Sequence, residues 1–421
     1  MYNVPVAAGT VETLVPIKVS GITAKQLVMQ SLLFQQNRAQ LLRRFVELGS
    51  FAIRNQYYLK SEKGSGKNKA IHFSYYSGWE NAGDTVLSKT VRDNFNLIQP
   101  ISWTLEKVTN KVTDKTIKLI NQNDYMVIGG GGLLLPDSNP NSISGWQWAI
   151  SEELLDKIEV PIIAYAIGYN FFAGQKPEEL FIQSLKKIIE KSSFFSLRNS
   201  GSIRAVKSLV GDELYLKIQF QPCPTTVIRK VDKSTPAKHK TKNVGINIAY
   251  DRYHLRYGAD IYEILNQVAI ALKNISSRGY LIYNICHLEN DKKFELTLDA
   301  QGVAYKSINL QYSLPRRTYE TYCNMELTIG TRGHAQMIPF GLNTKIISLG
   351  SHNKLKWFLE DIDSLDWFVN LREDVSTLSE RITTLFFEII DSDEAQNRID
   401  QEQLKLYEFT KANYKIIKEI I

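Results

Sequence analysis

The chain of 421 residues is longer than one hydrophobic core usually supports, which favours two domains. Hydrophobic residues make up 43% of it and charged residues 23%, a composition that excludes a disordered or fibrous chain. The net charge of +7 favours an anionic substrate or a membrane surface, and no nucleic-acid partner is expected.

The three cysteines, Cys223, Cys286 and Cys323, are widely spaced and odd in number. They cannot build a disulfide framework or a CxxC metal site, so we expect buried, reduced thiols. Residues 1–19 lack the pattern of a secretion signal, and no later stretch is long and apolar enough to span a bilayer. The expected location is the cytoplasm, including the inner face of the membrane.

Residues 1–69 are predicted to form an N-terminal helical extension. Between residues 24 and 53, apolar side chains recur at three- and four-residue spacing, which is typical of an amphipathic helix or helix pair. Arg38, Arg43 and Arg44 lie among them. The segment is therefore a candidate for peripheral membrane contact or oligomerisation, with packing on its own domain as the alternative.

A first α/β domain is predicted over residues 70–228. Short apolar runs alternate there with helical patterns, and several runs are continuous, as strands buried on both faces should be. This order predicts a parallel sheet with strands at 70–75, 125–128, 160–166 and 193–197.

A basic linker is predicted at residues 229–243, which are lysine-rich and contain Pro236. A second strand–helix series over 244–400 predicts another parallel sheet. Its strands are expected at 244–249, 280–285, 327–329 and 345–349, with a helix at 259–276. Residues 401–421 are predicted to form a C-terminal helix.

In open α/β sheets, ligands bind beyond the carboxyl ends of the strands, where loop amides and helix N-termini converge. The motif Asn81-Ala82-Gly83-Asp84 follows the first predicted strand. Gly83 permits close backbone approach, while Asp84 either caps the next helix or holds a substrate hydroxyl.

A run of four glycines at residues 129–132 follows the strand predicted at 125–128. Their exposed amides would leave a ligand unobstructed, so Gly130 and Gly131 are expected to line a cleft. A plain turn is the alternative.

Arg198 follows the strand predicted at 193–197, and Ser200 or Ser202 can cap the next helix. A guanidinium beside free helix amides binds carboxylate or phosphate, so this loop is a candidate anion site. A solvent-exposed arginine is the alternative.

The motif Thr331-Arg332-Gly333-His334-Ala335 ends a predicted strand and begins a helix. Arg332 supplies a permanent charge there and His334 a proton that titrates near neutrality, while Lys354 follows within reach of the same face. A structural histidine is the alternative. The other histidines have no comparable setting in the sequence, and no metal-ligand spacing is present; they are His72, His239, His254, His287 and His352.

Together these motifs resemble, in their order, those of the polysaccharide pyruvyl transferases: an Asn-x-Gly-Asp loop, a glycine run after a strand, an Arg followed by Ser, and an Arg-x-His-Ala motif followed by a Gly-x-x-x strand and a Lys. The resemblance covers about residues 71–354. Two positions depart from the family pattern. Gly333 stands where the family usually has Leu, and Pro222-Cys223-Pro224-Thr225 replaces an Asp-containing turn.

The resemblance implies an α/β fold of two Rossmann-like domains with a cleft between them, similar to the two-domain, GT-B-like glycosyltransferases. It also implies transfer of a pyruvyl group from phosphoenolpyruvate, a co-substrate, to hydroxyls of a sugar or glycan that is free or lipid-linked. Phosphate would be released, and neither a metal nor another cofactor would be needed.

The resemblance also assigns residues. Arg198, Arg332 and His334 would bind the carboxylate and phosphate of the donor, and Asp84 would serve the acceptor or proton transfer. The expected catalytic residues are His334, Asp84 and Arg332, and the expected substrate-binding residues are Asn81, Gly83, Gly130, Gly131, Arg198, Ser200 and Lys354.

Two other functions remain open at this point. A glycosyltransferase of the same architecture would use Arg332 and Lys354 to hold the diphosphate of a nucleotide sugar. A non-catalytic carbohydrate-binding protein would account for the departures at Gly333 and at the Pro222 turn.

Overall fold

The computed structural model describes residues 66–75, 81–137, 139–172, 174–350 and 353–421. These residues belong to one compact unit, which runs from Asn55 to Ile421. The helical extension expected between residues 24 and 53 lies outside the described residues.

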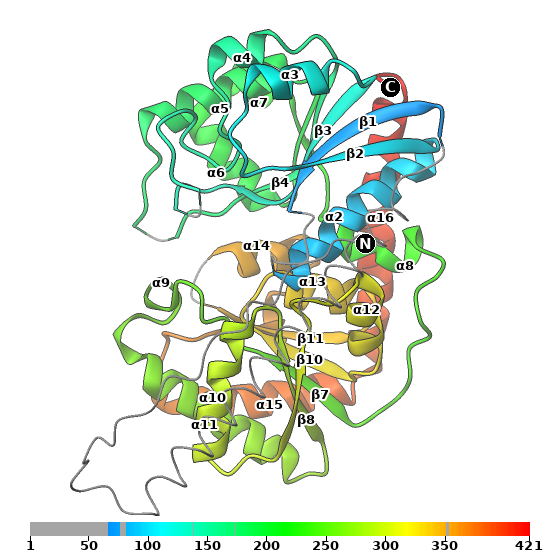
Figure 1. Cartoon of the computed structure of the whole chain (residues 1–421). Helices are drawn as coiled ribbons and strands as arrows, with labels where there is room; N and C mark the ends of the chain where they lie inside the picture. The colour runs from blue at the N-terminus through cyan, green and yellow to red at the C-terminus, as the bar shows by residue number, and fades with distance from the viewer. Residues whose placement is uncertain (1–65, 76–80, 138, 173, 351–352) are drawn as a thin grey trace, which may run out of the picture. The chain divides into compact units, whose positions relative to one another are not determined.

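A first sheet of six parallel strands has the order β2-β1-β3-β4-β5-β6 (Figure 1). Its strands are β1 (Asn68–Ser74), β2 (Ile101–Lys107), β3 (Tyr125–Leu134), β4 (Ile162–Tyr169), β5 (Phe194–Leu197) and β6 (Ile218–Phe220). Its helices are α2 (Ala82–Ile98), α3 (Asp114–Ile120), α4 (Glu152–Asp156), α5 (Glu179–Lys191), α6 (Ser200–Val210) and α7 (Asp212–Tyr215). We call this part the first lobe. Its strand order reverses between β1 and β3, which is where such sheets bind ligands.

A second sheet of six parallel strands has the order β12-β11-β10-β7-β8-β9. Its strands are β7 (Asn243–Asn247), β8 (Leu281–Cys286), β9 (Tyr305–Asn309), β10 (Leu327–Gly330), β11 (Lys345–Gly350) and β12 (Phe368–Asn370). Its helices are α9 (Tyr253–Tyr257), α10 (Ile261–Ser276), α11 (Glu295–Ala300), α12 (Pro315–Cys323), α13 (His334–Gly341), α14 (Asn353–Asp361) and α15 (Leu378–Ile390). We call this part the second lobe. Its strand order is that of a Rossmann sheet, and the order reverses between β7 and β10.

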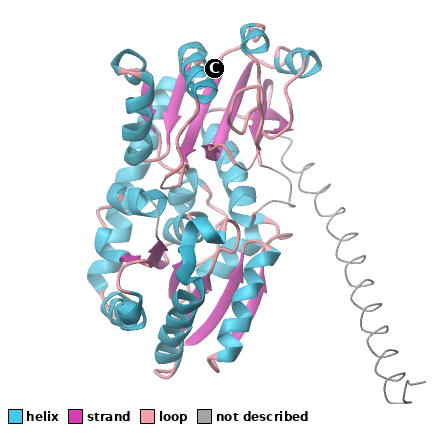
Figure 2. Ribbon diagram, turned by 90° about the vertical axis from the view of Figure 1, so that its left-hand side faces the viewer, coloured by secondary structure: helices cyan, strands magenta, loops and turns pink. Residues whose placement is uncertain are grey.

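The two sheets confirm the predicted pair of Rossmann-like domains. Their inner strands are apolar and buried on both faces, because helices cover each sheet from both sides (Figure 2). Every residue of β11 is buried, as is every residue of β4 except Tyr169. Each fully buried Val, Leu or Ile side chain stabilises the fold by roughly 1.5–3 kcal/mol relative to an exposed one.

The segment between the lobes begins with a 3-10 helix, η1 (Pro224–Val227), and the short helix α8 (Ile228–Val231), and then crosses to β7. At the other end of the chain, α16 (Asp393–Lys418) begins earlier than the helix predicted at 401–421. Figure 1 shows α16 passing beside α2, and the Tyr414 hydroxyl lies 2.7 Å from Oδ1 of Asn94 in that helix.

Helix α16 is bonded to both lobes. The Asn413 amide donates to the Phe220 carbonyl of the first lobe at 2.9 Å. Nearer the start of the helix, the Gln403 amide donates to Oδ1 of Asn343 in the second lobe at 2.8 Å. The last helix therefore belongs to both lobes rather than to one.

Two further features differ from the prediction. Strands β2, β6, β9 and β12 were not predicted, because they are three-residue or partly exposed strands without a continuous apolar run. The glycine run was expected as a loop, but residues 129–132 lie inside β3, where they continue its pairing with β4.

Candidate active site

The motifs 81–84 and 331–335 both follow strands at which the sheet order reverses. Helix α2 begins after β1 in the first lobe, and α13 begins after β10 in the second lobe. The structure brings the starts of these two helices into contact, because a Cβ atom added to Gly83 of α2 would fall 2.4 Å from Cβ of His334 in α13. The Ala82 amide also donates to the carbonyl of His287, which follows β8 of the second lobe, at 3.1 Å.

Asn81 is the residue that caps α2. Its side-chain oxygen accepts a hydrogen bond from the Gly83 amide at 2.8 Å. Asp84, one turn into the helix, is therefore not needed as the cap, and its Oδ1 lies 3.5 Å from Nδ1 of His334. The capping alternative for Asp84 is wrong, and the two expected proton-transfer groups meet across the lobes.

Gly83 is required by this contact. A Cβ atom added to it would lie 2.4 Å from Cβ of His334 and 2.9 Å from Nδ1, closer than such atoms pack. A glycine here lets the backbone of α2 lie directly against the imidazole.

His334 is 7% exposed, and its other ring nitrogen, Nε2, lies 3.9 Å from Sγ of Cys223. Burial holds the pKa of His334 well below its usual value, and the positive charges of Arg198 and Lys354 lower it further. The imidazole is therefore neutral at neutral pH and can accept a proton.

Arg198 lies at the carboxyl end of β5 and is 3% exposed. Its Nη2 donates to Oδ1 of Asn170 at 2.8 Å, whereas Nε and Nη1 have no hydrogen-bond partner among the described residues. The guanidinium lies on Gly168, where an added Cβ would fall 2.3 Å from Nε. The alternative of a solvent-exposed arginine is wrong: this is a buried cation with two unused donors.

Lys354, in α14, lies over Gly333. A Cβ atom added to Gly333 would fall 2.9 Å from Cε of Lys354 and 3.6 Å from its Nζ. Burial holds the pKa of Lys354 well below its usual value, followed by repulsion from Arg198 and Arg256. The glycine that departs from the family's leucine thus leaves room for the lysine.

Arg332 makes a network of ion pairs. Its Nε and Nη2 bond the two Asp291 oxygens at 3.0 and 2.6 Å, and its Nη1 lies 2.5 Å from Oδ1 of Asp251. Burial opposes the charge, but Asp291 and Asp251 raise the pKa of Arg332 above its usual value. All three guanidinium nitrogens therefore bind carboxylates of the second lobe.

Ser200 neither caps α6 nor faces an open anion site, and the predicted serine cap is wrong because Asn199 caps this helix by accepting from the Ser202 amide at 2.7 Å. Its hydroxyl and its amide bond Oδ1 of Asp361, at 2.5 and 3.1 Å, so that a carboxylate of the second lobe lies at the start of α6. Burial raises the pKa of Asp361 to about 6, against the opposing effect of the Ser200 hydrogen bonds. In this structure Ser200 joins the lobes.

Gly130 and Gly131 pack against α2. A Cβ atom added to Gly130 would lie 2.8 Å from Val91, and one added to Gly131 would lie 3.5 Å from Leu87. Of the four glycines, it is Gly132 that borders the Arg198 region, because an added Cβ there would overlap the Asn170 amide at 1.4 Å.

Comparisons with known proteins identify the family of this chain. The family model for polysaccharide pyruvyl transferase matches residues 49–353. The chain belongs to the polysaccharide pyruvyl transferase family. No curated protein matches the sequence.

The fold of this family member is also found among solved structures. A protein from Listeria monocytogenes, proposed to be a UDP-N-acetylglucosamine 2-epimerase, matches with a TM-score of 0.51 and 9% identity, over 80% of this chain and 91% of that one. The UDP-GlcNAc 2-epimerase of Neisseria meningitidis matches with a TM-score of 0.49 and 10% identity, over 83% and 98% of the two chains. At such low identity, the first match shows a shared GT-B-like architecture and nothing about substrates.

The site of this pyruvyl transferase family member also contains three side chains that the sequence analysis did not place there. Asn170, which orients Arg198, follows β4, and His287 follows β8. Both positions lie at carboxyl ends of strands, where ligands of such sheets bind, so the sequence could have indicated them. Nε2 of His287 forms a hydrogen bond with the Tyr322 hydroxyl at 2.6 Å. Burial, and next the positive charge of Arg332, lower the pKa of His287 to about 3. The expectation that His287 lacks a comparable setting is wrong. Cys223 is the third.

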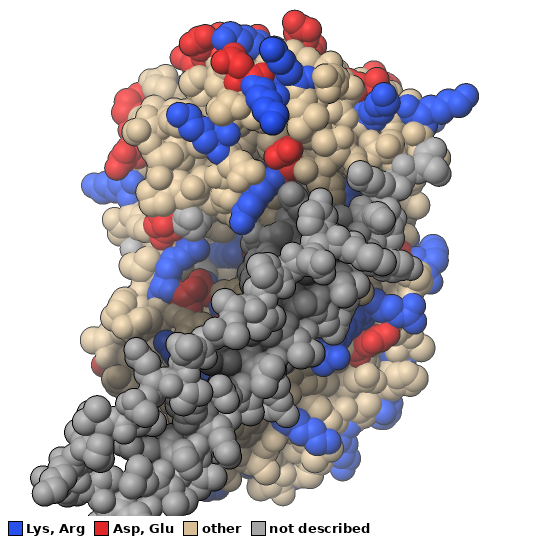
Figure 3. All heavy atoms as spheres, in the orientation of Figure 1, with Lys and Arg blue, Asp and Glu red and all other residues tan. Residues whose placement is uncertain are grey.

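All three cysteines are free and buried, as expected. No helix among the described residues has both the length and the apolar character to cross a membrane. On the face drawn in Figure 3, lysine and arginine side chains are scattered among acidic ones wherever the surface is not covered in grey.

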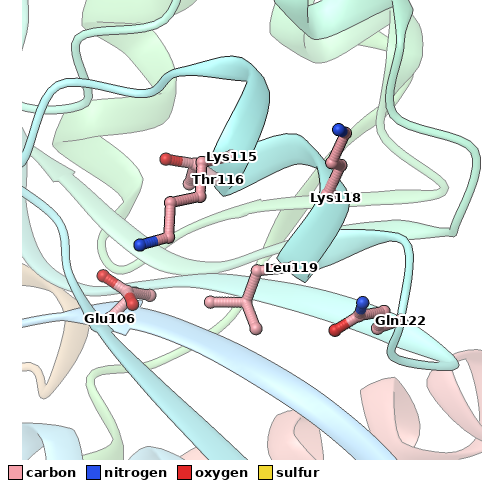
Figure 4. A pocket seen from close by; sticks show the side chains of 6 residues that line it. All are labelled: Glu106, Lys115, Thr116, Lys118, Leu119 and Gln122. Carbon is pink, nitrogen blue, oxygen red and sulfur yellow. The ribbon is translucent and has the colours of Figure 1, made fainter.

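A hollow of about 420 Å³ lies away from these residues, between the edge strand β2 and α3 (Figure 4). It is lined by Glu106, Lys115, Thr116, Lys118, Leu119 and Gln122. None of its lining residues belongs to the motifs that the family shares.

Proposed function

We propose that this chain transfers a pyruvyl group from phosphoenolpyruvate to hydroxyls of a sugar in a polysaccharide or its lipid-linked precursor, with release of phosphate. The observation that carries the proposal is the pair of nitrogens on buried Arg198, Nε and Nη1, that have no hydrogen-bond partner in the described part of the chain. A buried guanidinium with unused N–H groups is costly unless a ligand supplies acceptors.

Phosphoenolpyruvate supplies such acceptors through its carboxylate and phosphate. The Arg198 fork suits either group, and Lys354 adds a second cation, since each charge depresses the pKa of the same imidazole, that of His334. The positive charges of Arg198 and Lys354 are offset when the negatively charged phosphoenolpyruvate binds.

The chemistry follows from the neutral imidazole. Ketal formation needs a proton at C3 of the donor, addition of a sugar hydroxyl at C2, departure of phosphate and closure by a second hydroxyl. His334, oriented by Asp84, accepts the proton of the attacking hydroxyl. Bound donor cancels part of the positive charge around His334, which raises its pKa and strengthens it as a base.

Arg332 has a different role in this proposal from the one expected. Because its three nitrogens bind Asp251 and Asp291, it holds the loop that carries His334 instead of contacting the donor. Lys354 and Arg198 are the donor-binding cations.

The proposal is tested by phosphate release from phosphoenolpyruvate with glycans from a cell lysate as acceptors. Arg198→Ala should lower kcat/KM for phosphoenolpyruvate by about 10- to 100-fold, the effect of losing hydrogen bonds to a charged group. Arg198→Lys should be intermediate, because an ammonium cannot present a fork. Arg316→Ala is the control, since that side chain is 76% exposed.

Two outcomes would contradict pyruvyl transfer. Turnover of a nucleotide sugar without phosphate release from phosphoenolpyruvate would indicate a glycosyltransferase. Glycan binding that survives His334→Ala, in a protein that turns over neither donor, would indicate a carbohydrate-binding protein.

A further inference from the structure

Cys223 lies beside His334, on the side of the imidazole away from Asp84. It lies between β6 and η1, is 2% exposed, and its Sγ is 3.9 Å from Nε2 of His334. Asp84 lies at 3.5 Å from the opposite nitrogen. The imidazole is thus held between a carboxylate and a thiol, the arrangement of a reactive group, a base and an orienting acid.

The position of the thiol is set by a side-chain contact and by backbone packing, since Sγ also lies 3.2 Å from Oγ1 of Thr225. The Cys223 carbonyl accepts from the Thr226 amide at 2.9 Å and from its hydroxyl at 2.8 Å. Behind it, η1 packs against α13 so closely that a Cβ atom on Gly341 would fall 1.9 Å from the Thr225 carbonyl oxygen. The helix that begins at His334 therefore also positions the segment that carries Cys223.

This geometry determines where protons can lie. A carboxylate accepts hydrogen bonds only, so Asp84 favours the tautomer of His334 with its proton on Nδ1. Nε2 is then an acceptor, and it faces the thiol. In the neutral pair, Nε2 of His334 carries no proton that could pass to phosphoenolpyruvate, whereas Cys223 keeps one on sulfur.

We propose that Cys223 gives its proton to the methylene carbon, C3, of phosphoenolpyruvate, a role that rests on the proposed function. Arg198 is the second observation behind it, because two of its nitrogens lie buried in the same site with no partner among the residues that the structure describes. Burial raises the pKa of the Cys223 thiol and keeps it protonated, while the charges of Arg198 and Lys354 oppose that rise and stabilise a transient thiolate.

The step balances without another reactant. The S–H bond breaks, and the C2=C3 electron pair forms the new C3–H bond, leaving a cationic C2. A sugar hydroxyl adds to C2, and its proton passes to Nε2 of His334 and on to the thiolate, which restores both groups. Phosphate then leaves with the electron pair of its bond to C2, a second hydroxyl closes the ketal, and the proton of that hydroxyl leaves with phosphate.

Cys223→Ala and Cys223→Asp test the role. The alanine variant should lower acceptor-dependent phosphate release by about 10²- to 10⁴-fold, the contribution of one positioned acid. Its affinity for phosphoenolpyruvate, measured by calorimetry, should stay within about twofold, because Arg198 and Lys354 are intact. Cys286→Ala is the matched control, since that thiol is also free and buried but lies in β8.

The aspartate variant separates chemistry from structure. A carboxyl group is protonated only at lower pH, so Cys223→Asp should recover activity as the pH falls and shift the pH optimum downward. An alanine variant with full activity, or an aspartate variant with an unchanged pH profile, would overturn the role of Cys223. If the unaltered protein released no phosphate, the proposed function would be refuted and the role of Cys223 with it.

Discussion

Replacing Gly83 with alanine separates activity from stability. Alanine is a better helix former than glycine by about 1 kcal/mol, and Gly83 is the second residue of α2. The added methyl group, however, would lie 2.4 Å from Cβ of His334. Local propensity and the site therefore favour opposite residues at this position.

The size of the effect follows from that distance. Ordinary van der Waals contact begins near 3.4 Å, so the imidazole or the helix must move by about 1 Å. A displacement of this size costs about 10²-fold in rate, or about 2.7 kcal/mol in the free energy of activation. It would also lengthen the 3.5 Å contact between Asp84 and His334.

The assay is kcat/KM for acceptor-dependent phosphate release, with thermal unfolding measured in parallel. Gly83→Ala should lose about 100-fold in kcat/KM while it still unfolds cooperatively. Gly302→Ala is the opposite control, because Gly302 has φ +64° and open space around it, so alanine there should cost about 1 kcal/mol of stability and no activity. A Gly83→Ala protein with full kcat/KM would refute the required close contact between α2 and His334.

Three further predictions concern charge. Lys354→Met removes a cation that lowers the pKa of His334, so the acidic limb of the kcat/KM profile should move to higher pH; an unmoved limb would exclude His334 as the base. Arg332→Ala leaves the buried carboxylate of Asp291 without its cation, although Asp251 keeps Arg256 at 3.0 Å, and should cost about 3–5 kcal/mol in urea unfolding, whereas an unchanged midpoint would contradict the ion-pair network. Burial followed by Arg92 lowers the pKa of His72 to about 3, so the unfolded state alone takes up its proton as the pH falls below 6.5. Between pH 7 and pH 5, the free energy of unfolding of the His72→Asn protein should therefore fall by about 2 kcal/mol less than that of the unaltered protein. Equal falls in the two proteins would contradict a neutral His72.

Much of the fold could be predicted because inner parallel strands are buried on both faces and read as continuous apolar runs. The same rule fails at sheet edges. Strand β9 is partly exposed along its length, and β12 has three residues, so neither carries such a run. The glycine run was misplaced for another reason: without side chains it has no apolar signal, yet its backbone continues the pairing of β3 with β4.

The site was predictable to the level of loops but not of partners. Strand ends selected Asp84, Arg198 and His334, which the structure brings into one region. Spacing could not show that Arg332 is bound by Asp291 and Asp251, because those carboxylates come from other strand ends of the second lobe. The contact of Cys223 with His334 was equally hidden, since it arises from the packing of η1 on α13.

Helix α16 limits how relatives of this protein can be recombined. A boundary drawn at residues 229–243 would treat the two lobes as exchangeable modules. Asn413 of that last helix bonds Phe220 of the first lobe, however, while Gln403 bonds Asn343 of the second. A chimera that took its first lobe from a relative would keep a mismatched final helix, and we expect it to fold well only when the α16 residues that face the exchanged lobe are taken from the same parent.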